Sequence, residues 1–293
     1  MKVDSYKAYN PDALMRFKLS KRLAHSYTKI NNILRWAEEL KPDKIMELIS
    51  TFQRKLSEAI DENVVEIDWD QISKVIEEMD YLSNNPELTI ILTRYIIHHL
   101  EISNDLRDLE REIEVTSFNH ARENERLQYY IAKACPEILG EEDGTKFWKD
   151  IVALRLRDEK QEYEARMKEN PERMERSVLE ISKGAIKWWK ETGVGDFTRV
   201  IFDDHKILYR FDKCITPEVL KELNDPKWAY LSSCYIGDAP GFNFGERYLR
   251  RTQTLHTSPF CDELYWNPSV HENPEQPSLE FTTGVERNID LLE

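Results

Sequence analysis

Glycine is missing from the first 139 residues of this 293-residue chain, and all nine glycines lie between Gly140 and Gly284. Proline is sparse in the same stretch, where it occurs four times. These two residue types most often end a helix or form a turn. A long region with so few of them is typical of helices joined by short connections. We therefore predict that residues 1–139 form a helical region.

Long apolar runs and paired cysteines are also missing. None of the four cysteines forms a CxxC pair, so neither a ribbon-type zinc site nor a thioredoxin-type motif is indicated. The most apolar stretch, Leu88–Leu100, is interrupted by Arg94 and two histidines and is too short to span a bilayer. The first residues lack the apolar segment of a signal peptide. We expect a cytoplasmic protein with reduced thiols.

Basic residues are outnumbered by acidic ones, and the formal net charge is −14. No basic stripe dominates any predicted element, which argues against a nucleic-acid partner. The composition, 40% hydrophobic and 11% aromatic, is sufficient for packed cores. We therefore expect a small-molecule substrate, with no cofactor, no metal, no nucleic acid and no membrane partner. The oligomeric state stays open.

Apolar residues recur at helical spacing in the first region. Two such faces consist of Leu23, Tyr27, Ile30, Leu34 and Ala37, and of Ile45, Ile49, Phe52, Leu56 and Ile60. Asp68 is suited to cap another helix, with Gln71 three residues further on. A further helix is expected from Pro86 past Leu109, with a charged and solvated end at 105–112. We expect these helices to pack as a bundle.

The run Gly140–Gly144 is the best candidate for a domain boundary. It divides the chain into a helical N-terminal region, residues 1–139, and a second domain, residues 140–293. Gly193 is expected to end the last helix before the sequence pattern changes.

After this last helix, apolar residues alternate at a spacing of two, as in half-buried strands. Strands are expected at 197–202 and 207–211, joined by a hairpin at 203–205. Two more are expected at 247–255 and 263–266, with short helices in between. The sequence thus predicts an α+β protein, in which a helical N-terminal region precedes a small antiparallel sheet flanked by helices.

Four features that combine thiols, carboxylates and an arginine follow one another between residues 207 and 266. They are the strand end Leu208-Tyr-Arg-Phe-Asp-Lys-Cys214, the pair Cys234 and Asp238, the run Arg251-Thr-Gln-Thr-Leu255, and the pair Cys261-Asp262. In this order and at this spacing they resemble the L-2-amino-thiazoline-4-carboxylic acid hydrolase family. The resemblance covers roughly the last 150 residues, if the helices from Thr145 are included.

The sequence departs from the family pattern at one loop. The family usually has a glycine-rich turn before the Cys-Asp pair, whereas this chain has His256-Thr-Ser-Pro-Phe260. If this loop borders the pocket, the substrate differs from that of the family's namesake. The family is also similar in fold to vinyl-reductase-type small-ligand domains, and this likeness concerns the fold more than the function.

The resemblance implies a hydrolase that acts on a C–N bond of a small cyclic amidine or a related carboxylate substrate, with a role in specialised metabolism. Such chemistry needs a nucleophile or base, an acid and a cation for the carboxylate. The implied catalytic residues are Cys234, Asp238, Cys214 and Cys261, and the implied substrate-binding residues are Arg251, Thr252, Asp262 and His256.

Two arginines compete for the role of carboxylate clamp. Arg250 and Arg251 are neighbours on a predicted strand, so their side chains point to opposite faces of the sheet. The resemblance favours Arg251, because it aligns with the family motif. We also predict that at least two of the three cysteines lie at one pocket, with Asp238 on its wall.

Several alternatives stay open at this point. A free cysteine is often a small core residue rather than a reactive one. The same pocket could belong to a non-catalytic small-ligand or zinc-binding sensor domain, in which the thiols are metal ligands. The helical region could also be the functional part, as an interaction module.

Overall fold

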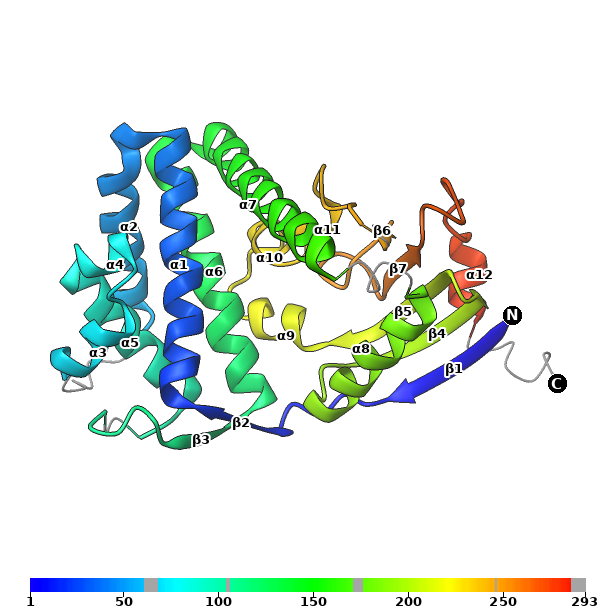
Figure 1. Ribbon diagram of the computed structural model, residues 1–293, viewed down its shortest axis with the longest axis horizontal. Coiled ribbons are helices and arrows are strands. Elements are labelled where there is room, and N and C mark those ends of the chain that lie inside the picture. The colour runs from blue at the N-terminus through cyan, green and yellow to red at the C-terminus, as the bar shows by residue number, and fades with distance from the viewer. Residues whose placement is uncertain (61–67, 104–105, 171–175, 246, 286–293) are drawn as a thin grey trace. The chain divides into compact units, whose positions relative to one another are not determined.

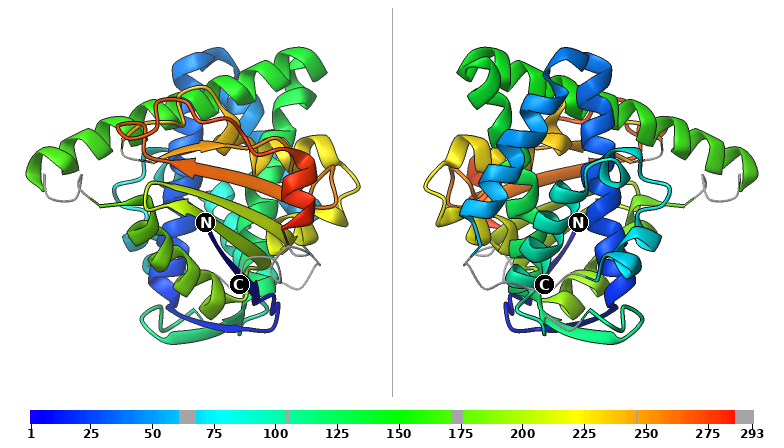
Figure 2. Two further views of the ribbon diagram at one scale, coloured as in Figure 1. Left: turned by 90° about the vertical axis from the view of Figure 1, so that its right-hand side faces the viewer. Right: turned by 90° about the vertical axis from the view of Figure 1, so that its left-hand side faces the viewer.

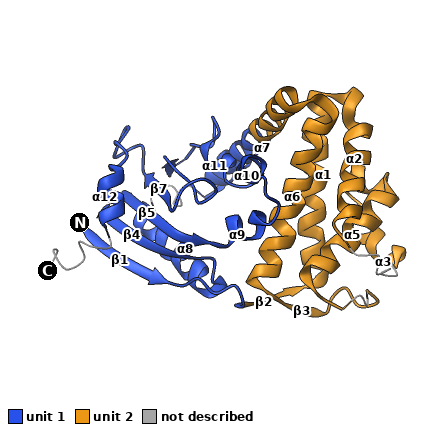
Figure 3. Cartoon of the chain, turned by 180° about the vertical axis from the view of Figure 1, so that it is seen from behind, with its two compact units in different colours: residues 1–13, 156–293 blue, residues 14–155 orange. Residues whose placement is uncertain are grey.

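The computed structural model describes residues 1–60, 68–103, 106–170, 176–245 and 247–285. The chain forms two compact units, which are coloured separately in Figure 3. Unit 1 consists of residues 1–13 and 156–293, and unit 2 of residues 14–155. Among the described residues, no helix combines the length and the apolar character needed to span a bilayer.

Unit 2 is predominantly helical (Figure 1). Its elements are β2 (Leu14–Lys18), α1 (Leu19–Leu40), η1 (Pro42–Lys44), α2 (Ile45–Glu58), α3 (Trp69–Val75), α4 (Asp80–Ser83), α5 (Pro86–Leu100), β3 (Glu112–Thr116), α6 (Ser117–Leu139) and the first part of α7 (Glu141–Glu169). Helices α2, α5 and α6 pack against one another, and α1 packs against α2 and α5. The predicted apolar face of α1 is fully buried. Asp68 caps α3 by accepting a hydrogen bond from the backbone of Gln71, as predicted.

A buried ion pair joins the first and the sixth helix of unit 2. Arg22 on α1 faces Glu123 on α6, and both side chains are almost completely excluded from solvent. Ser26, one turn after Arg22, donates a 3.0 Å hydrogen bond to the same carboxylate. Removing either charged partner would therefore leave the other buried charge unpaired.

Two segments of unit 2 differ from the sequence prediction. Strands β2 and β3 pair in an antiparallel ribbon, so the prediction that the whole region is helical is wrong there. The helix from Pro86 ends at Leu100, because Glu101 takes a left-handed conformation at φ 55°. Leu106 and Leu109 are buried, which corrects the prediction of a fully solvated segment, although residues 104–105 lie outside the described range.

Unit 1 contains a five-stranded antiparallel sheet with strand order β1-β4-β5-β7-β6. The strands are β1 (Lys2–Lys7), β4 (Gly195–Asp203), β5 (Lys206–Cys214), β7 (Cys261–Trp266) and β6 (Tyr248–Arg250). The predicted hairpin between β4 and β5 is confirmed. The predicted α+β architecture is confirmed as well: helices dominate the N-terminal part, and a small antiparallel sheet flanked by helices follows.

The two faces of this sheet have separate apolar cores. The sheet and the helices α8 and α12 can be followed in Figures 1 and 2. Helix α8 (Val178–Thr192) packs on the face that carries Phe197, Tyr209, Phe211 and Cys261. Gly193 ends this helix in a left-handed conformation, as predicted. The opposite face buries Leu208, Leu264 and Trp266, and residues of α12 (Leu279–Gly284) pack against it. The strand residues that face α8 are those on which the candidate site is built.

The first strand explains why the units differ from the predicted division. Strand β1 pairs with β4, so residues 2–7 are not helical and belong to unit 1. The alternation in Lys-Val-Asp-Ser-Tyr-Lys is short, and its partner lies almost 200 residues away along the chain. Gly140, with φ 81°, separates α6 from α7, so the predicted boundary at 139/140 is a helix junction inside unit 2.

Three short helices connect β5 to β6: α9 (Ile215–Lys221), α10 (Pro226–Ser232) and α11 (Tyr235–Asp238). The predicted strand at 247–255 is confirmed only for β6. Beyond β6 the backbone N–H groups of Thr252 and Gln253 donate to the carboxylate of Asp262 at 2.8 and 2.9 Å. Because a side chain occupies these donors, the ladder to β7 ends there.

Candidate functional site

Arg251 is the centre of a polar cluster on the face of the sheet that α8 covers. Its Nε donates to Asp238 at 3.0 Å, and one terminal nitrogen donates to Glu263 at 3.1 Å. The other terminal nitrogen donates to the carbonyl oxygen of Cys234 at 2.5 Å. The Arg251 side chain is 6% exposed. Gly237 makes this arrangement possible, since a Cβ there would meet the guanidinium at 2.7 Å.

The electrostatics of the cluster follow from these contacts. Burial opposes the charged form of Arg251, but Glu263 and then Cys234 and Asp238 outweigh it and raise the pKa of the guanidinium. Tyr230 donates a 2.9 Å hydrogen bond to the second oxygen of Asp238. Burial and this neighbouring carboxylate raise the pKa of Tyr230. At neutral pH the cluster therefore contains a guanidinium cation and a protonated phenol.

Glu263 belongs to the cluster and was missed by sequence reasoning. One of its oxygens accepts from Arg251 and lies 3.9 Å from the sulfur of Cys261, and the other accepts from Tyr265 at 2.9 Å. Cys261, Glu263 and Tyr265 alternate along β7 and share one face of the sheet. A signal was thus present, because Glu263 lies two residues after a predicted site residue on a predicted strand.

Asp262 points to the opposite face and has a different role. It is completely buried, and its oxygens accept from the backbone of Thr252 and Gln253, from the hydroxyl of Thr252 and from the amide of Gln276. The structure thus brings together two predicted substrate-binding residues, Thr252 and Asp262. Their shared contacts hold the loop after β6 in place.

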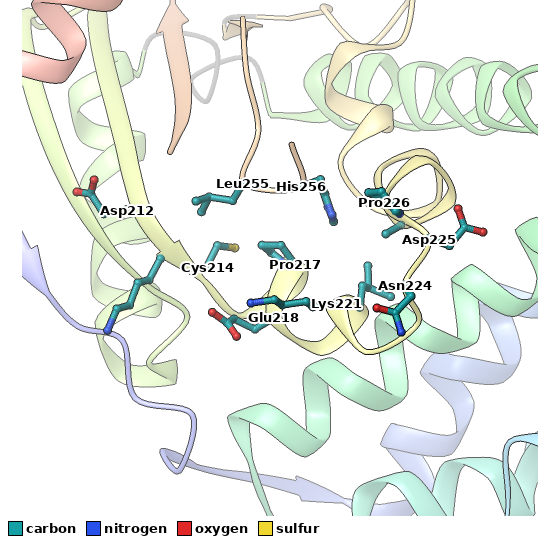
Figure 4. A pocket seen from close by; sticks show the side chains of 13 residues that line it. Asp212, Cys214, Pro217, Glu218, Lys221, Asn224, Asp225, Pro226, Leu255 and His256 are labelled. Carbon is teal, nitrogen blue, oxygen red and sulfur yellow. The ribbon is translucent and has the colours of Figure 1, made fainter. Parts of the chain in front are cut away.

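A cavity of about 400 Å³ in unit 1 contains two other predicted site residues, Cys214 and His256. Its wall is formed by Asp212, Lys213, Cys214, Pro217, Glu218, Leu220, Lys221, Asn224, Asp225, Pro226, Ala229, Leu255 and His256. Figure 4 shows Cys214 and Leu255 on one side and His256 and Pro226 on the other, with Pro217 and Lys221 between them. A thiol and an imidazole therefore border one space of small-molecule size.

His256 is neutral in this cavity. Burial, together with the positive charge of Arg251, lowers the pKa of the imidazole to about 4. The Nε2 atom lies 3.0 Å from the hydroxyl oxygen of Ser233. At neutral pH the imidazole therefore carries one proton and one lone pair.

The three C-terminal cysteines differ in environment. Cys214, at the end of β5, and Cys234, between α10 and α11, are partly exposed, whereas Cys261 is buried. Burial and then Glu263 raise the pKa of the Cys261 thiol, and Cys234 and Cys214 contribute in the same direction. A buried thiol with a raised pKa is a poor nucleophile. Cys214 and Cys234 are thus the better candidates.

A second cavity of about 420 Å³ lies at the edge strand β6. Asp238 and Arg251 contribute to its wall together with Arg250 and Trp266. Arg250 points away from Arg251, as predicted, and donates to the carbonyl oxygen of Pro274 at 2.6 Å. The prediction of two cysteines and Asp238 at one pocket is met by neither of these cavities, because Cys214 and Asp238 border different ones.

In the described part of the chain, no group of three or more His, Cys, Asp and Glu side chains is arranged to hold a metal ion. The zinc-binding alternative therefore has no ligand set within these residues. In comparisons with known proteins, no family model, no curated protein and no solved structure matches the chain.

Proposed function

We propose that unit 1 is a hydrolase that opens a small cyclic amidine, or a related substrate with a reactive C–N bond, and that the substrate carries a carboxylate. The observation that carries this proposal is the cavity between Cys214 and His256, which contains a partly exposed thiol and a neutral imidazole. Its volume of about 400 Å³ suits a small-molecule ligand. The resemblance of residues 207–266 supplies the reaction class.

Cys214 is the nucleophile in this proposal, with Cys234 as the second candidate. In a 2-amino-thiazoline the amidine carbon lies between nitrogen and the ring sulfur. The Cys214 thiol loses its proton as its sulfur attacks this carbon, the ring C–S bond breaks, and the departing sulfur takes up a proton. Water then attacks the same carbon and releases Cys214, which leaves an N-carbamoyl amino acid. The sum of the two steps is the addition of one water molecule to the substrate.

Charged residues of the same wall provide the other functions. Glu218 is exposed on α9 and is suited to accept the proton of the attacking water. Lys221 lies one turn further along α9, and Figure 4 shows it beside Glu218. Its ammonium group is suited to pair with the substrate carboxylate.

The predicted roles of Arg251 and Asp238 stay part of the proposal in a modified form. A guanidinium has five N–H donors, and three of those of Arg251 contact protein atoms. A substrate carboxylate that approaches Arg251 would have to compete with Asp238 and Glu263. We therefore propose that the Arg251 cluster organises the wall beside the cavity, and that Lys221 is the primary clamp.

The test is turnover of 2-amino-thiazoline-4-carboxylate by the full chain, with the N-carbamoyl product detected by mass spectrometry. Cys214→Ser is expected to reduce turnover by about 100-fold or more, because a hydroxyl without a strong base is a poor nucleophile. Cys135→Ser is the matched control, since Cys135 is buried in unit 2. Full activity of Cys214→Ser would refute Cys214 as the nucleophile.

One observation favours a second candidate, a non-catalytic small-ligand domain. Arg251 forms ion pairs with both Asp238 and Glu263 within the protein, as expected in a binding scaffold that performs no chemistry. Saturable binding of cyclic amidines without product formation over long incubations would support this alternative.

A further inference from the structure

Ser233 forms two hydrogen bonds through one hydroxyl group. Its oxygen lies 2.6 Å from the carbonyl oxygen of Ala229 and 3.0 Å from Nε2 of His256. A carbonyl oxygen can only accept, so the single hydroxyl proton of Ser233 is donated to Ala229. This contact, from a serine to the carbonyl oxygen four residues earlier, is a common one at the end of a helix.

The tautomer of His256 follows from this assignment. Because the Ser233 proton is already used, the imidazole has to donate through Nε2–H to the serine oxygen. A neutral imidazole with its proton on Nε2 has a lone pair on Nδ1. Burial and Arg251 keep the ring neutral by lowering its pKa to about 4.

The lone pair is available to a ligand. Among the described residues, Nδ1 of His256 has no hydrogen-bond partner. The fully buried polar atoms that lack a partner do not include this nitrogen. His256 borders the cavity, and Figure 4 shows its ring projecting into the space opposite Cys214. Because Nδ1 can only accept, the space beside it is suited to a ligand group that donates an N–H bond.

We propose that Ser233 is a positioning residue that fixes His256 as a hydrogen-bond acceptor, and that the cavity thereby selects ligands that present an amidine-type N–H group. This inference rests on the proposed function for the identity of the site, and it goes further by assigning the recognition element. A ligand of the same shape without the N–H group leaves the acceptor unpaired, and such mismatches are strongly rejected by polar sites.

The first test is the tautomer itself. Nitrogen-15 NMR of the full chain, labelled on histidine and assigned with His256→Gln, is expected to show the protonated nitrogen of His256 as Nε2 at neutral pH. Ser233→Ala is expected to give a mixture of tautomers, and Ser233→Thr to restore the single one, because threonine keeps the hydroxyl. A proton on Nδ1 in the unmodified chain would overturn the proposal, and this result does not depend on the folding of any variant.

The second test is discrimination between two probes, 2-amino-2-thiazoline and 2-methyl-2-thiazoline, by isothermal titration calorimetry. The amino compound is expected to bind about tenfold more tightly or better, and Ser233→Ala to remove most of this difference. Ser232→Ala is the matched control, since Ser232 donates to the same carbonyl oxygen of Ala229, whereas the hydroxyl that meets Nε2 of His256 is that of Ser233. Equal discrimination in Ser233→Ala and Ser232→Ala would overturn the proposal.

Binding and turnover separate this inference from the proposed function. Ser233-dependent binding of the amino probe, without ring opening of the carboxylated substrate, supports the recognition element and contradicts the hydrolase. Ring opening with unchanged kinetics in Ser233→Ala supports the hydrolase and overturns the recognition element.

Discussion

Replacement of Arg251 by lysine tests whether this residue is a structural centre of unit 1. Arg251 contacts Asp238, Glu263 and the carbonyl oxygen of Cys234 with three different nitrogens. A lysine ammonium can keep one carboxylate partner but cannot reproduce the fork that reaches all three. A hydrogen bond to a charged group contributes about 1.5–3 kcal/mol, so we expect Arg251→Lys to lower the unfolding free energy by at least that amount. Arg251→Met should lower the unfolding free energy by about 3–5 kcal/mol, because it leaves two carboxylates without their positively charged partner.

The assay is urea unfolding followed by tryptophan fluorescence and by hydrogen exchange of peptides from β7. The local probe is needed because two compact units need not unfold together. Arg250→Lys is the control, since its hydrogen-bond partners are the carbonyl oxygen of Pro274 and the amide oxygen of Asn273, and its guanidinium lies 5.2 Å from the centre of the Trp266 ring. These are partners without charge, and the loss should be about 0.5–1.5 kcal/mol.

Two outcomes would contradict the structural role of Arg251. One is an equal loss of stability in Arg251→Lys and Arg250→Lys. The other is a change in substrate KM for Arg251→Lys without any loss of stability, which would identify a guanidinium that serves the substrate instead of the protein.

Three further predictions concern other parts of the chain. Glu123→Ala should lower the stability of unit 2 by about 3–5 kcal/mol in urea unfolding, because it leaves the buried Arg22 without its charged partner. Glu114→Ala removes an exposed ion pair and should cost less than about 1 kcal/mol. Equal losses of stability in the two variants would refute the role of the buried pair. Asp262→Asn should accelerate hydrogen exchange at the amides of Thr252 and Gln253, and unchanged protection there would contradict the anchoring of the loop. Iodoacetamide at neutral pH should modify the partly exposed Cys214 and Cys234 before the buried Cys135 and Cys261, because burial raises the pKa of the latter two thiols. Peptide mass spectrometry measures the order of modification. Early modification of Cys261 would refute this order.

Local patterns were sufficient to predict much of unit 1 and of the helical faces. Alternation of apolar residues identified β4 and β5, and Asp68 and Gly193 acted as the helix cap and helix end that their residue types favour. Strand β1 could not be found in this way, because six residues at a sheet edge carry little pattern and their partner is remote in sequence.

The contacts of the site depend on register, which the sequence does not show. Arg251 meets Glu263 because β6 and β7 pair so that Arg250 lies opposite Leu264. The hydroxyl of Ser233 reaches His256 across 23 residues. Residue types therefore indicated where reactive groups gather, but their division between two cavities came from the fold.

The most direct measurement of the central claim is a crystal structure of the full chain with 2-amino-thiazoline-4-carboxylate, at a pH above the pKa of His256. The account predicts that the ligand lies in the cavity between Cys214 and His256, with its carboxylate toward Lys221 and its amidine N–H toward Nδ1. Ligand bound instead at the second cavity, against Arg250 and Arg251, would contradict it.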